Sequence, residues 1–146
     1  RLQGDWSSDV CSSDLRQIEF SVVDMTLHER GGVETAKDIQ SVLDDVRDKV
    51  AVLKPPAFNR FQNSFSHIFA GGYAAGYYSY KWAEVLSADA FSRFEEDGIF
   101  DEKSGRDFLR LVLETGGVNE PLENFTAFRG RPPEIDALLR HSGLSA

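Results

Sequence analysis

The 146-residue sequence predicts an all-α fold, and three observations support this prediction. Apolar residues recur every three or four positions in several segments, which is the spacing of one face of an α-helix. Glycine or proline follows each of these segments, where either residue ends a helix. No segment of useful length alternates apolar and polar residues as a half-buried strand does. The length allows one modest domain.

Two helices are expected in the first third of the chain. Residues 17–27 carry apolar side chains at mostly helical spacing, and a pair of glycines follows them. Residues 33–53 form the second helix, which a pair of prolines stops. The apolar stripe of this second helix consists of Ala36, Ile39, Val42, Leu43, Val46, Val50 and Leu53.

Residues 57–69 are polar and aromatic without a clean period, so we expect a loop there. The longest helix is expected to begin at Tyr73 or Ala74 and to end at Asp97, before a glycine. Its apolar stripe includes Tyr78, which we assign to the core. Three shorter helices are expected over residues 102–115, 121–128 and 133–142, and the inward-facing residues of the last are Ile135, Leu138 and Leu139.

The most informative stretch is residues 65–82, which read FSHIFAGGYAAGYYSYKW. One histidine and four tyrosines lie within 14 residues of this stretch, separated by small residues. A tyrosine hydroxyl is a neutral donor on a rigid side chain, and a donor preplaced at a developing oxyanion lowers a barrier by roughly 2.7–4 kcal/mol. The glycines permit backbone angles closed to other residues and leave room for another chain.

Tyr73, Tyr77 and Tyr80 are spaced i, i+4 and i+7. If the helix begins near Tyr73, their three hydroxyls share one face. The same residues have a structural interpretation, because a helical aromatic stripe is usually part of a core. A lone histidine near phenylalanines, such as His67, is usually structural as well. On the residues alone, the structural interpretation is favoured.

The stretch resembles the substrate-binding and transition-state loop of the M3 family of zinc metallopeptidases, which includes the thimet oligopeptidases and oligopeptidases A. The resemblance covers residues 16–144 and is most specific over residues 67–82. Other segments that resemble the C-terminal end of the bacterial members are Arg16–Phe20, Leu27–His28, Ala83–Phe100, Phe128–Arg131 and Leu138–His141. The resemblance implies that residues 16–146 are the C-terminal helical part of the family's catalytic domain.

The resemblance also implies roles for individual residues. Tyr73 and Tyr80 match tyrosines that contact the substrate backbone and stabilise the intermediate. Tyr77 matches a tyrosine that supports the transition state, and His67 matches a histidine that hydrogen-bonds the bound peptide. The flexible glycines that take part in substrate binding are Gly71, Gly72 and Gly76.

The family's zinc is held by a His-Glu-x-x-His helix, in which two histidines one turn apart bind the metal. None of the three histidines here, His28, His67 and His141, has a second histidine four residues later. Gly32 stands where the second ligand after His28 would be. The resemblance therefore implies a cytoplasmic zinc endopeptidase for short peptides whose metal-binding helix lies upstream. We expect this chain to require that missing N-terminal part and to be inactive alone.

Residues 1–15 do not resemble the family. The run DWSSDVCSSDL over residues 5–15 resembles a translated sequencing-library adapter, so we expect a non-native segment joined to a gene fragment. A genuine Ser/Asp-rich disordered N-terminus is the alternative. Cys11 is the only cysteine of the chain, so residues 16–146 offer neither disulfides nor thiolate metal ligands.

Composition excludes several classes of partner. The net charge of −8, without a basic stripe, argues against binding to nucleic acid or anionic membranes. No apolar run reaches the length of a membrane span, and no secretory signal is visible. A second hypothesis remains open, in which the chain is a non-catalytic helical module that holds peptides with its Gly/Tyr loop.

The remaining charged groups have structural interpretations. Adjacent acidic residues at 44–45 and 95–97 point apart on a helix and are expected on solvated faces. Arg129 and Arg131 flank a glycine and are expected to fix a surface turn rather than to bind a substrate carboxylate. His28 and His141 are expected to be structural or exposed.

Overall fold

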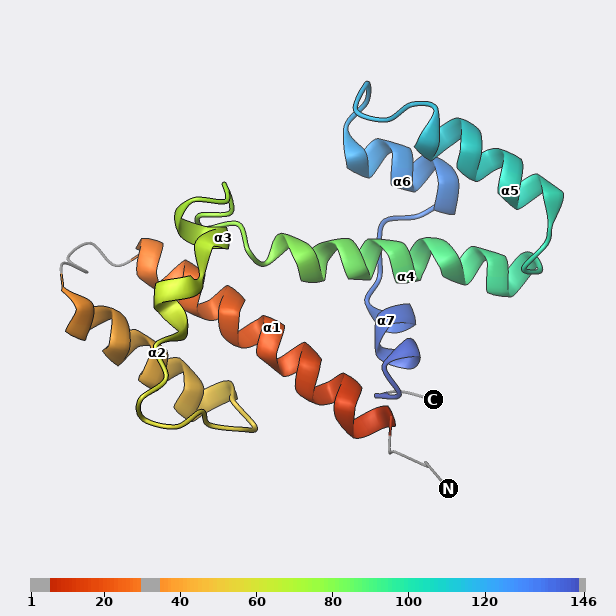
Figure 1. Cartoon of the computed structure of the whole chain (residues 1–146). Coiled ribbons are helices and arrows are strands. Elements are labelled where there is room, and N and C mark those ends of the chain that lie inside the picture. The colour runs from red at the N-terminus through yellow and green to blue at the C-terminus, as the bar shows by residue number, and fades with distance from the viewer. Residues whose placement is uncertain (1–5, 30–34, 145–146) are drawn as a thin grey trace. The chain divides into compact units, whose positions relative to one another are not determined.

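The computed structural model describes residues 6–29 and 35–144, with side chains from Ser13 onward (Figure 1). Every regular element in these residues is helical and none is a strand, which confirms the predicted all-α class. The chain divides into two compact units, Arg1–Lys81 and Trp82–Ala146. Each unit has its own buried residues.

The first unit is built on two helices, α1 (Trp6–Glu29) and α2 (Ala36–Val50). Helix α1 begins well before the expected residue 17, because no glycine or proline occurs between residues 6 and 29. The helix therefore includes much of the segment expected to be non-native or disordered. Residues 1–5 lie outside the described part, and the origin of residues 1–15 stays a prediction.

Helix α2 is shorter than the expected 33–53 because a capping box fixes its start. The Thr35 amide donates to Asp38 Oδ2 at 2.9 Å, and the Asp38 amide donates to Thr35 Oγ1 at 3.3 Å. The helix ends before Ala51, whose backbone is extended, and Leu53 is 82% exposed rather than part of the stripe. The start of the predicted segment, residues 33–34, lies outside the described residues.

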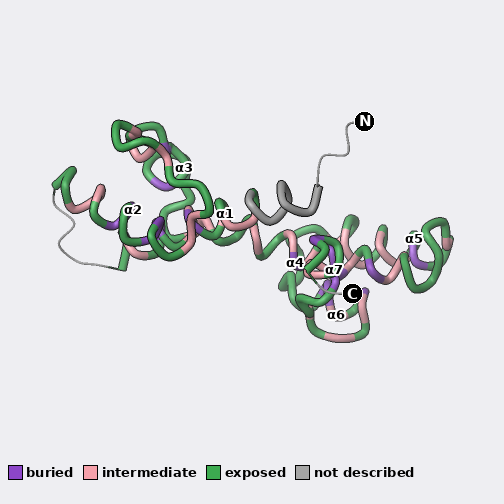
Figure 2. Tube along the Cα trace, turned by 90° about the horizontal axis from the view of Figure 1, so that it is seen from below, coloured by how far each residue is buried: buried purple, intermediate pink, exposed green. Residues whose placement is uncertain are grey.

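The core of the first unit lies between α1 and α2. Val23 of α1 packs with three buried residues of α2, and Leu27, Ile39, Val50 and Phe61 surround them. Figure 2 shows the buried parts of the described chain as short stretches between exposed ones. An ion pair joins Arg47 Nε to Glu19 Oε1 at 2.8 Å within the same interface, and both side chains are about nine-tenths buried.

Residues 57–69 are not one loop, contrary to expectation. They contain two short helical turns, η1 (Phe61–Ser64) and α3 (Ser66–Phe69). Phe65 and Ile68 are buried in this segment, 4% and 2% exposed. Burial of these two side chains anchors turns that have no helical period long enough to detect in the sequence.

Helix α4 (Ser79–Asp97) begins later than expected and is shorter than α1. The turn before it contains Ala75, whose φ of 53° is left-handed and incompatible with a continuous helix. The sequence pattern predicts a core position for Tyr78, and this prediction is wrong, because Tyr78 is 54% exposed. Trp82 is also half-exposed, and the buried residues of α4 are Val85, Ala88, Asp89 and Ser92.

The second unit adds α5 (Glu102–Phe108), the π-helical turn η2 (Leu109–Leu113), α6 (Pro121–Arg129) and α7 (Asp136–His141). The expected helix over 102–115 is thus divided, and the other two expected helices are confirmed with altered bounds. Rings of α4, α5 and α6 meet in its interior, with 5.3 Å between the centroids of Phe108 and Phe128. Ala137 of α7 is buried, whereas Ile135, which directly precedes the helix, is exposed, contrary to expectation.

Asp89 is a buried carboxylate that joins α4 to the segment after α6. Its oxygens accept hydrogen bonds from Arg129 Nε at 3.2 Å, from both terminal nitrogens of Arg131 at 2.6 and 2.8 Å, and from the Glu134 amide at 2.7 Å. Burial alone would raise the pKa of Asp89, but the bonds from Arg131, Glu134 and Arg129 hold it below its ordinary value. The interpretation that both arginines fix a turn is confirmed.

The acidic runs expected on solvated faces are exposed, as predicted. Glu95 nevertheless has two partners, His141 Nε2 at 2.9 Å and the Arg140 guanidinium. Glu96 accepts hydrogen bonds from both terminal nitrogens of Arg129, at 2.8 and 3.0 Å. The end of α4 is therefore bound to α6 and α7 through charged pairs at the surface of the unit.

We predict that Asp89→Asn lowers the free energy of unfolding of this unit by about 3 kcal/mol, because two guanidinium groups lose the charge of their shared carboxylate. Urea unfolding followed by circular dichroism measures the change. Glu114→Gln, at an exposed carboxylate of the same unit, is the matched control and should change stability little. Equal stability of both variants would contradict the role of Asp89.

Candidate functional site

The tyrosine loop, defined as residues 70–78, rests on a layer of aromatic rings in the first unit. Phe20 of α1 stacks on Phe61 with 4.4 Å between ring centroids. Phe65 lies 4.7 Å from Phe61 and 5.1 Å from Tyr77, against whose ring it packs edge-on. The half-buried Tyr77 is thus the side chain that ties the loop to the core.

The predicted site residues His67, Tyr73, Tyr77 and Tyr80 form one cluster. The ring centroids of Tyr73 and Tyr80 are 5.2 Å apart and nearly parallel, and those of Tyr77 and Tyr80 are 5.1 Å apart. The His67 ring lies 5.8 Å from Tyr77, 6.1 Å from Tyr73 and 6.3 Å from Tyr80. The structure therefore brings together the four aromatic residues that the sequence singled out.

The backbone conformation that brings the tyrosines together differs from the one expected. Because α4 begins only at Ser79, Tyr73 and Tyr77 do not share a helix face with Tyr80. A sequence of turns replaces the helix, closed by hydrogen bonds from the Gly76 amide to the Tyr73 carbonyl at 2.8 Å and from the Ser79 amide to the Gly76 carbonyl at 3.1 Å. The tyrosines meet because the chain folds back, not because of helical spacing.

The glycines of the loop have unequal roles. A Cβ on Gly71 would lie 3.0 Å from the Cα and the carbonyl oxygen of His67, so the backbone would have to move. Gly72 has a φ of +80°, a left-handed conformation that favours glycine. A Cβ on Gly76 would meet its nearest atoms at ordinary contact distances, 3.5 Å or more. Gly71 and Gly72 are required by the local geometry, whereas Gly76 is not.

Asp24 is a site residue that the sequence reasoning missed. Its side chain is fully buried, and it accepts hydrogen bonds from the Ala75 amide at Oδ1 and the Tyr77 amide at Oδ2, both at 2.9 Å. His28 Nδ1 lies 2.9 Å from Oδ1 and donates to the Asp24 carbonyl at 2.8 Å. The signal was present in the sequence: Asp24 stands four residues after Phe20, on the same helical face as an aromatic residue.

The pKa values of two hydroxyl groups of the cluster, those of Tyr77 and Tyr80, are raised. A hydrogen bond with Tyr73 is the main cause that raises the pKa of Tyr80 above 10.0, and burial and the neighbouring tyrosines act in the same direction. Burial raises the pKa of Tyr77, against a smaller opposing effect of Arg16. Tyr73 and Tyr80 are each 37% exposed, and His67 is also exposed. Neutral phenols that reach solvent are suited to donate hydrogen bonds to an oxygen of a bound molecule.

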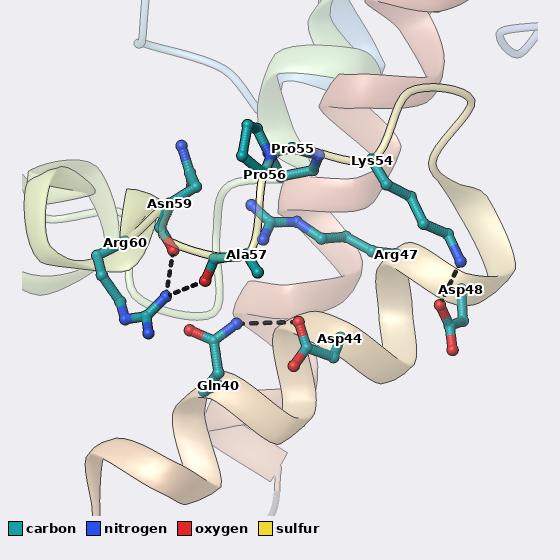
Figure 3. Close-up of a pocket in the computed structure, with 10 residues that line it drawn as sticks. All are labelled: Gln40, Asp44, Arg47, Asp48, Lys54, Pro55, Pro56, Ala57, Asn59 and Arg60. Atoms are coloured by element: carbon teal, nitrogen blue, oxygen red, sulfur yellow. Dashed lines mark hydrogen bonds and ion pairs between the residues drawn. The ribbon is translucent and has the colours of Figure 1, made fainter.

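A separate pocket of about 230 Å³ lies between α2 and residues 54–60 (Figure 3). Its charged groups are largely paired within the chain, since Lys54 Nζ binds Asp48 at 2.6 Å and Arg47 binds Glu19. Arg60 donates to the carbonyls of Ala57 and Asn59, both at 2.8 Å, as Figure 3 shows. None of the predicted site residues lines this pocket, and its polar groups serve to fix the segment that follows α2.

The described residues contain no group of three or more His, Cys, Asp or Glu side chains placed to hold a metal ion. The three histidines of the chain lie in different settings, beside Asp24, in the tyrosine cluster and beside Glu95. The described residues therefore do not fit the zinc that the family resemblance implies. Among the described helices, none is both long enough and apolar enough to cross a membrane.

We predict that Gly71→Ala and Gly72→Ala disturb the loop and that Gly76→Ala does not. The first forces a contact with the His67 backbone and should cost about 1–3 kcal/mol. The second places a side chain at a left-handed φ and should cost about 1–2 kcal/mol. Two-dimensional NMR of the tyrosine ring protons checks this, because ring-current shifts report the stacked cluster. Wild-type shifts in Gly71→Ala would contradict the geometry.

Comparisons with known proteins give the cluster its context. The model of "Peptidase family M3" matches residues 7–144. Oligopeptidase A of Haemophilus influenzae is 56% identical over 130 residues, which are 89% of this chain and 19% of that protein. The probable cytosolic oligopeptidase A of Arabidopsis thaliana is 53% identical over 92% of this chain and 20% of its own length. Saccharolysin of Saccharomyces cerevisiae is 34% identical over 89% of this chain.

The chain thus spans about a fifth of the length of these curated relatives. The matched residues include the whole aromatic cluster, the α1 and 61–65 segments that support it, and the second unit up to residue 144. With a family model that matches nearly the entire chain and relatives above 50% identity, the chain belongs to peptidase family M3.

Proposed function

We propose that this chain forms part of the substrate-binding wall of a longer zinc endopeptidase of the oligopeptidase A type, which hydrolyses short peptides. The observation that carries the proposal is the cluster of His67, Tyr73 and Tyr80. These residues are exposed, and their ring centroids lie 5.2 to 6.3 Å from one another. Membership of a peptidase family supports peptide hydrolysis as the reaction of the whole protein.

In this proposal Tyr73 and Tyr80 donate hydrogen bonds to the carbonyl oxygen of the peptide bond that is cleaved. As a nucleophile adds to that carbonyl, negative charge develops on the oxygen, and a preplaced neutral donor stabilises it more than it stabilises the substrate. The raised pKa of Tyr80 supports this role, because the hydroxyl keeps its proton at neutral pH. Tyr77 supports the transition state from beside Tyr80.

His67 and the glycines serve substrate binding in the same proposal. The exposed His67 ring lies beside Tyr73 and is placed to hydrogen-bond the backbone of a peptide. Gly71 lets the loop backbone lie close to that of His67, and Gly72, where a Cβ would meet no atom within 4 Å, leaves the neighbouring surface free of a side chain. An extended peptide can therefore approach the loop backbone closely. Gly76 would contribute the same absence of a side chain nearer to Tyr77.

We place the zinc and the residues that activate water outside this chain, because the described residues do not fit a metal centre. Several large apolar side chains of this chain remain exposed. They support the proposal that another part of the protein packs against it. Phe58, Phe100 and Val118 are 81%, 95% and 86% exposed. A cytoplasmic location is part of the proposal and is supported by the cytosolic plant relative.

We predict that Tyr80→Phe lowers kcat by about 100-fold or more with little change in KM, because the lost hydrogen bond acts in the transition state. The test replaces the matched segment of the H. influenzae oligopeptidase A by this chain and measures hydrolysis of a fluorogenic short peptide. Tyr78→Phe, at an exposed tyrosine outside the cluster, is the matched control. An unchanged kcat in Tyr80→Phe rules out the proposed role.

We also predict that the purified 146-residue chain does not hydrolyse peptides when zinc is supplied. The same fluorogenic peptide measures this, with the H. influenzae enzyme as positive control. Zinc-dependent cleavage that is removed by a chelator and follows the chain through purification would show that it carries its own metal centre. The division of the site between this chain and another part of the protein would then be wrong.

A further inference from the structure

We infer that Asp24 is a positioning residue, which sets the geometry of the tyrosine cluster through two backbone amides. The inference rests on the proposed function of Tyr73 and Tyr80. Asp24 itself is fully buried and lies beneath the loop, so it would act through the loop rather than on a substrate.

The two amides that Asp24 binds are placed to control the whole loop. They belong to Ala75 and Tyr77, one on each side of Gly76, and they lie between Tyr73 and Tyr80 in the chain. The hydrogen bonds span 51 and 53 residues of sequence, so they connect the loop to α1. A rotation of the backbone at residues 75–77 would change the separation of the Tyr73 and Tyr80 rings, which are now stacked at 5.2 Å.

The loop needs such a restraint because its backbone is strained and open. Ala75 has a φ of 53°, a region in which a non-glycine residue is unfavourable. The loop residues around it are exposed, apart from the half-buried Gly76 and Tyr77. The two hydrogen bonds that the buried carboxylate accepts offset this strain and hold one conformation among the several that a glycine-rich loop could adopt.

A carboxylate is the side chain suited to this task. Its two oxygens accept one amide each, and His28 completes its contacts at 2.9 Å. Asparagine has the same shape but presents one oxygen and one NH₂ group, so one of the two amides would face a donor. Asp24→Asn therefore releases one end of the loop while it changes the buried volume very little.

The kinetic test uses the H. influenzae chimaera that carries this chain. We expect Asp24→Asn to lower kcat by about 10- to 100-fold with little change in KM, because the donors are displaced rather than removed. In the Tyr80→Phe background the same substitution should have a much smaller effect, since the displaced donor is already absent. Asp45→Asn, at an exposed carboxylate of α2, is the matched control. Thermal unfolding of each variant shows whether the protein is folded.

The outcomes separate this inference from the proposed function. If Tyr80→Phe leaves kcat unchanged, the role proposed for Tyr80 is wrong. If Tyr80→Phe lowers kcat but Asp24→Asn does not, only the role of Asp24 is wrong. If Asp24→Asn lowers kcat equally in both backgrounds, Asp24 has a general structural role and the inference is overturned.

Amide hydrogen exchange tests the restraint in the 146-residue chain without a variant. We expect the Ala75 and Tyr77 amides to exchange at least about tenfold more slowly than those of Gly72 and Ala74, for which the described residues show no acceptor. Slow exchange of this pair supports the restraint even if Asp24→Asn fails to fold. Equal exchange at all four amides would mean that Asp24 does not hold the loop.

Discussion

The buried carboxylate of Asp24 accepts hydrogen bonds that the carbonyl groups of a preceding helical turn would otherwise accept. Amides at the start of a helix have no partner within it and must find acceptors elsewhere. Before α4, the Ala75 and Tyr77 amides find theirs on α1, at Asp24. The chain can therefore leave the helical path over residues 73–78 without burying unpaired donors. Because Asp24 supplies these acceptors in place of helix carbonyls, α4 can begin as late as Ser79 and the three tyrosines can come close together.

The second unit also contains a buried carboxylate that accepts several hydrogen bonds, but its partners differ. Asp89 is buried like Asp24, but two arginine side chains and one amide bind it. Guanidinium groups bring compensating charge, so this carboxylate forms a rigid crosslink between α4 and residues 129–134. Backbone amides carry only partial charge, and the partners of the Asp24 carboxylate are two such amides and His28. One carboxylate thus serves stability, whereas the other serves the shape of an exposed loop.

Much of this fold follows from patterns within single segments. Apolar spacing predicted the main helices, and glycine and proline predicted where several of them end. Both signals lie within a short segment, so they can be recognised from the sequence. The errors occurred where long-range contacts override local preference. Helical spacing placed Tyr73 in α4 and Tyr78 in the core, but the acceptor that breaks the helix is more than 50 residues away in sequence. No window of residues around the loop contains that information.

The site shows the same division between local and long-range information. The residue types and their density indicated His67, Tyr73, Tyr77 and Tyr80, and these rings do gather in one cluster. The sequence treated the three loop glycines alike, whereas backbone geometry separates Gly76 from the other two. Asp89 was not singled out from the sequence, although this carboxylate stands four residues after the buried Val85. An acidic residue in register with an apolar stripe marks a buried acceptor in both units.

The left-handed backbone at Ala75 has a consequence for the unfolded chain. Glycine would relieve the strain of a positive φ, but it samples more conformations than alanine when the protein is unfolded. Folding of the loop would then lose more conformational entropy. Alanine therefore replaces part of that entropy loss by local strain in the folded state, where the two hydrogen bonds to Asp24 offset it.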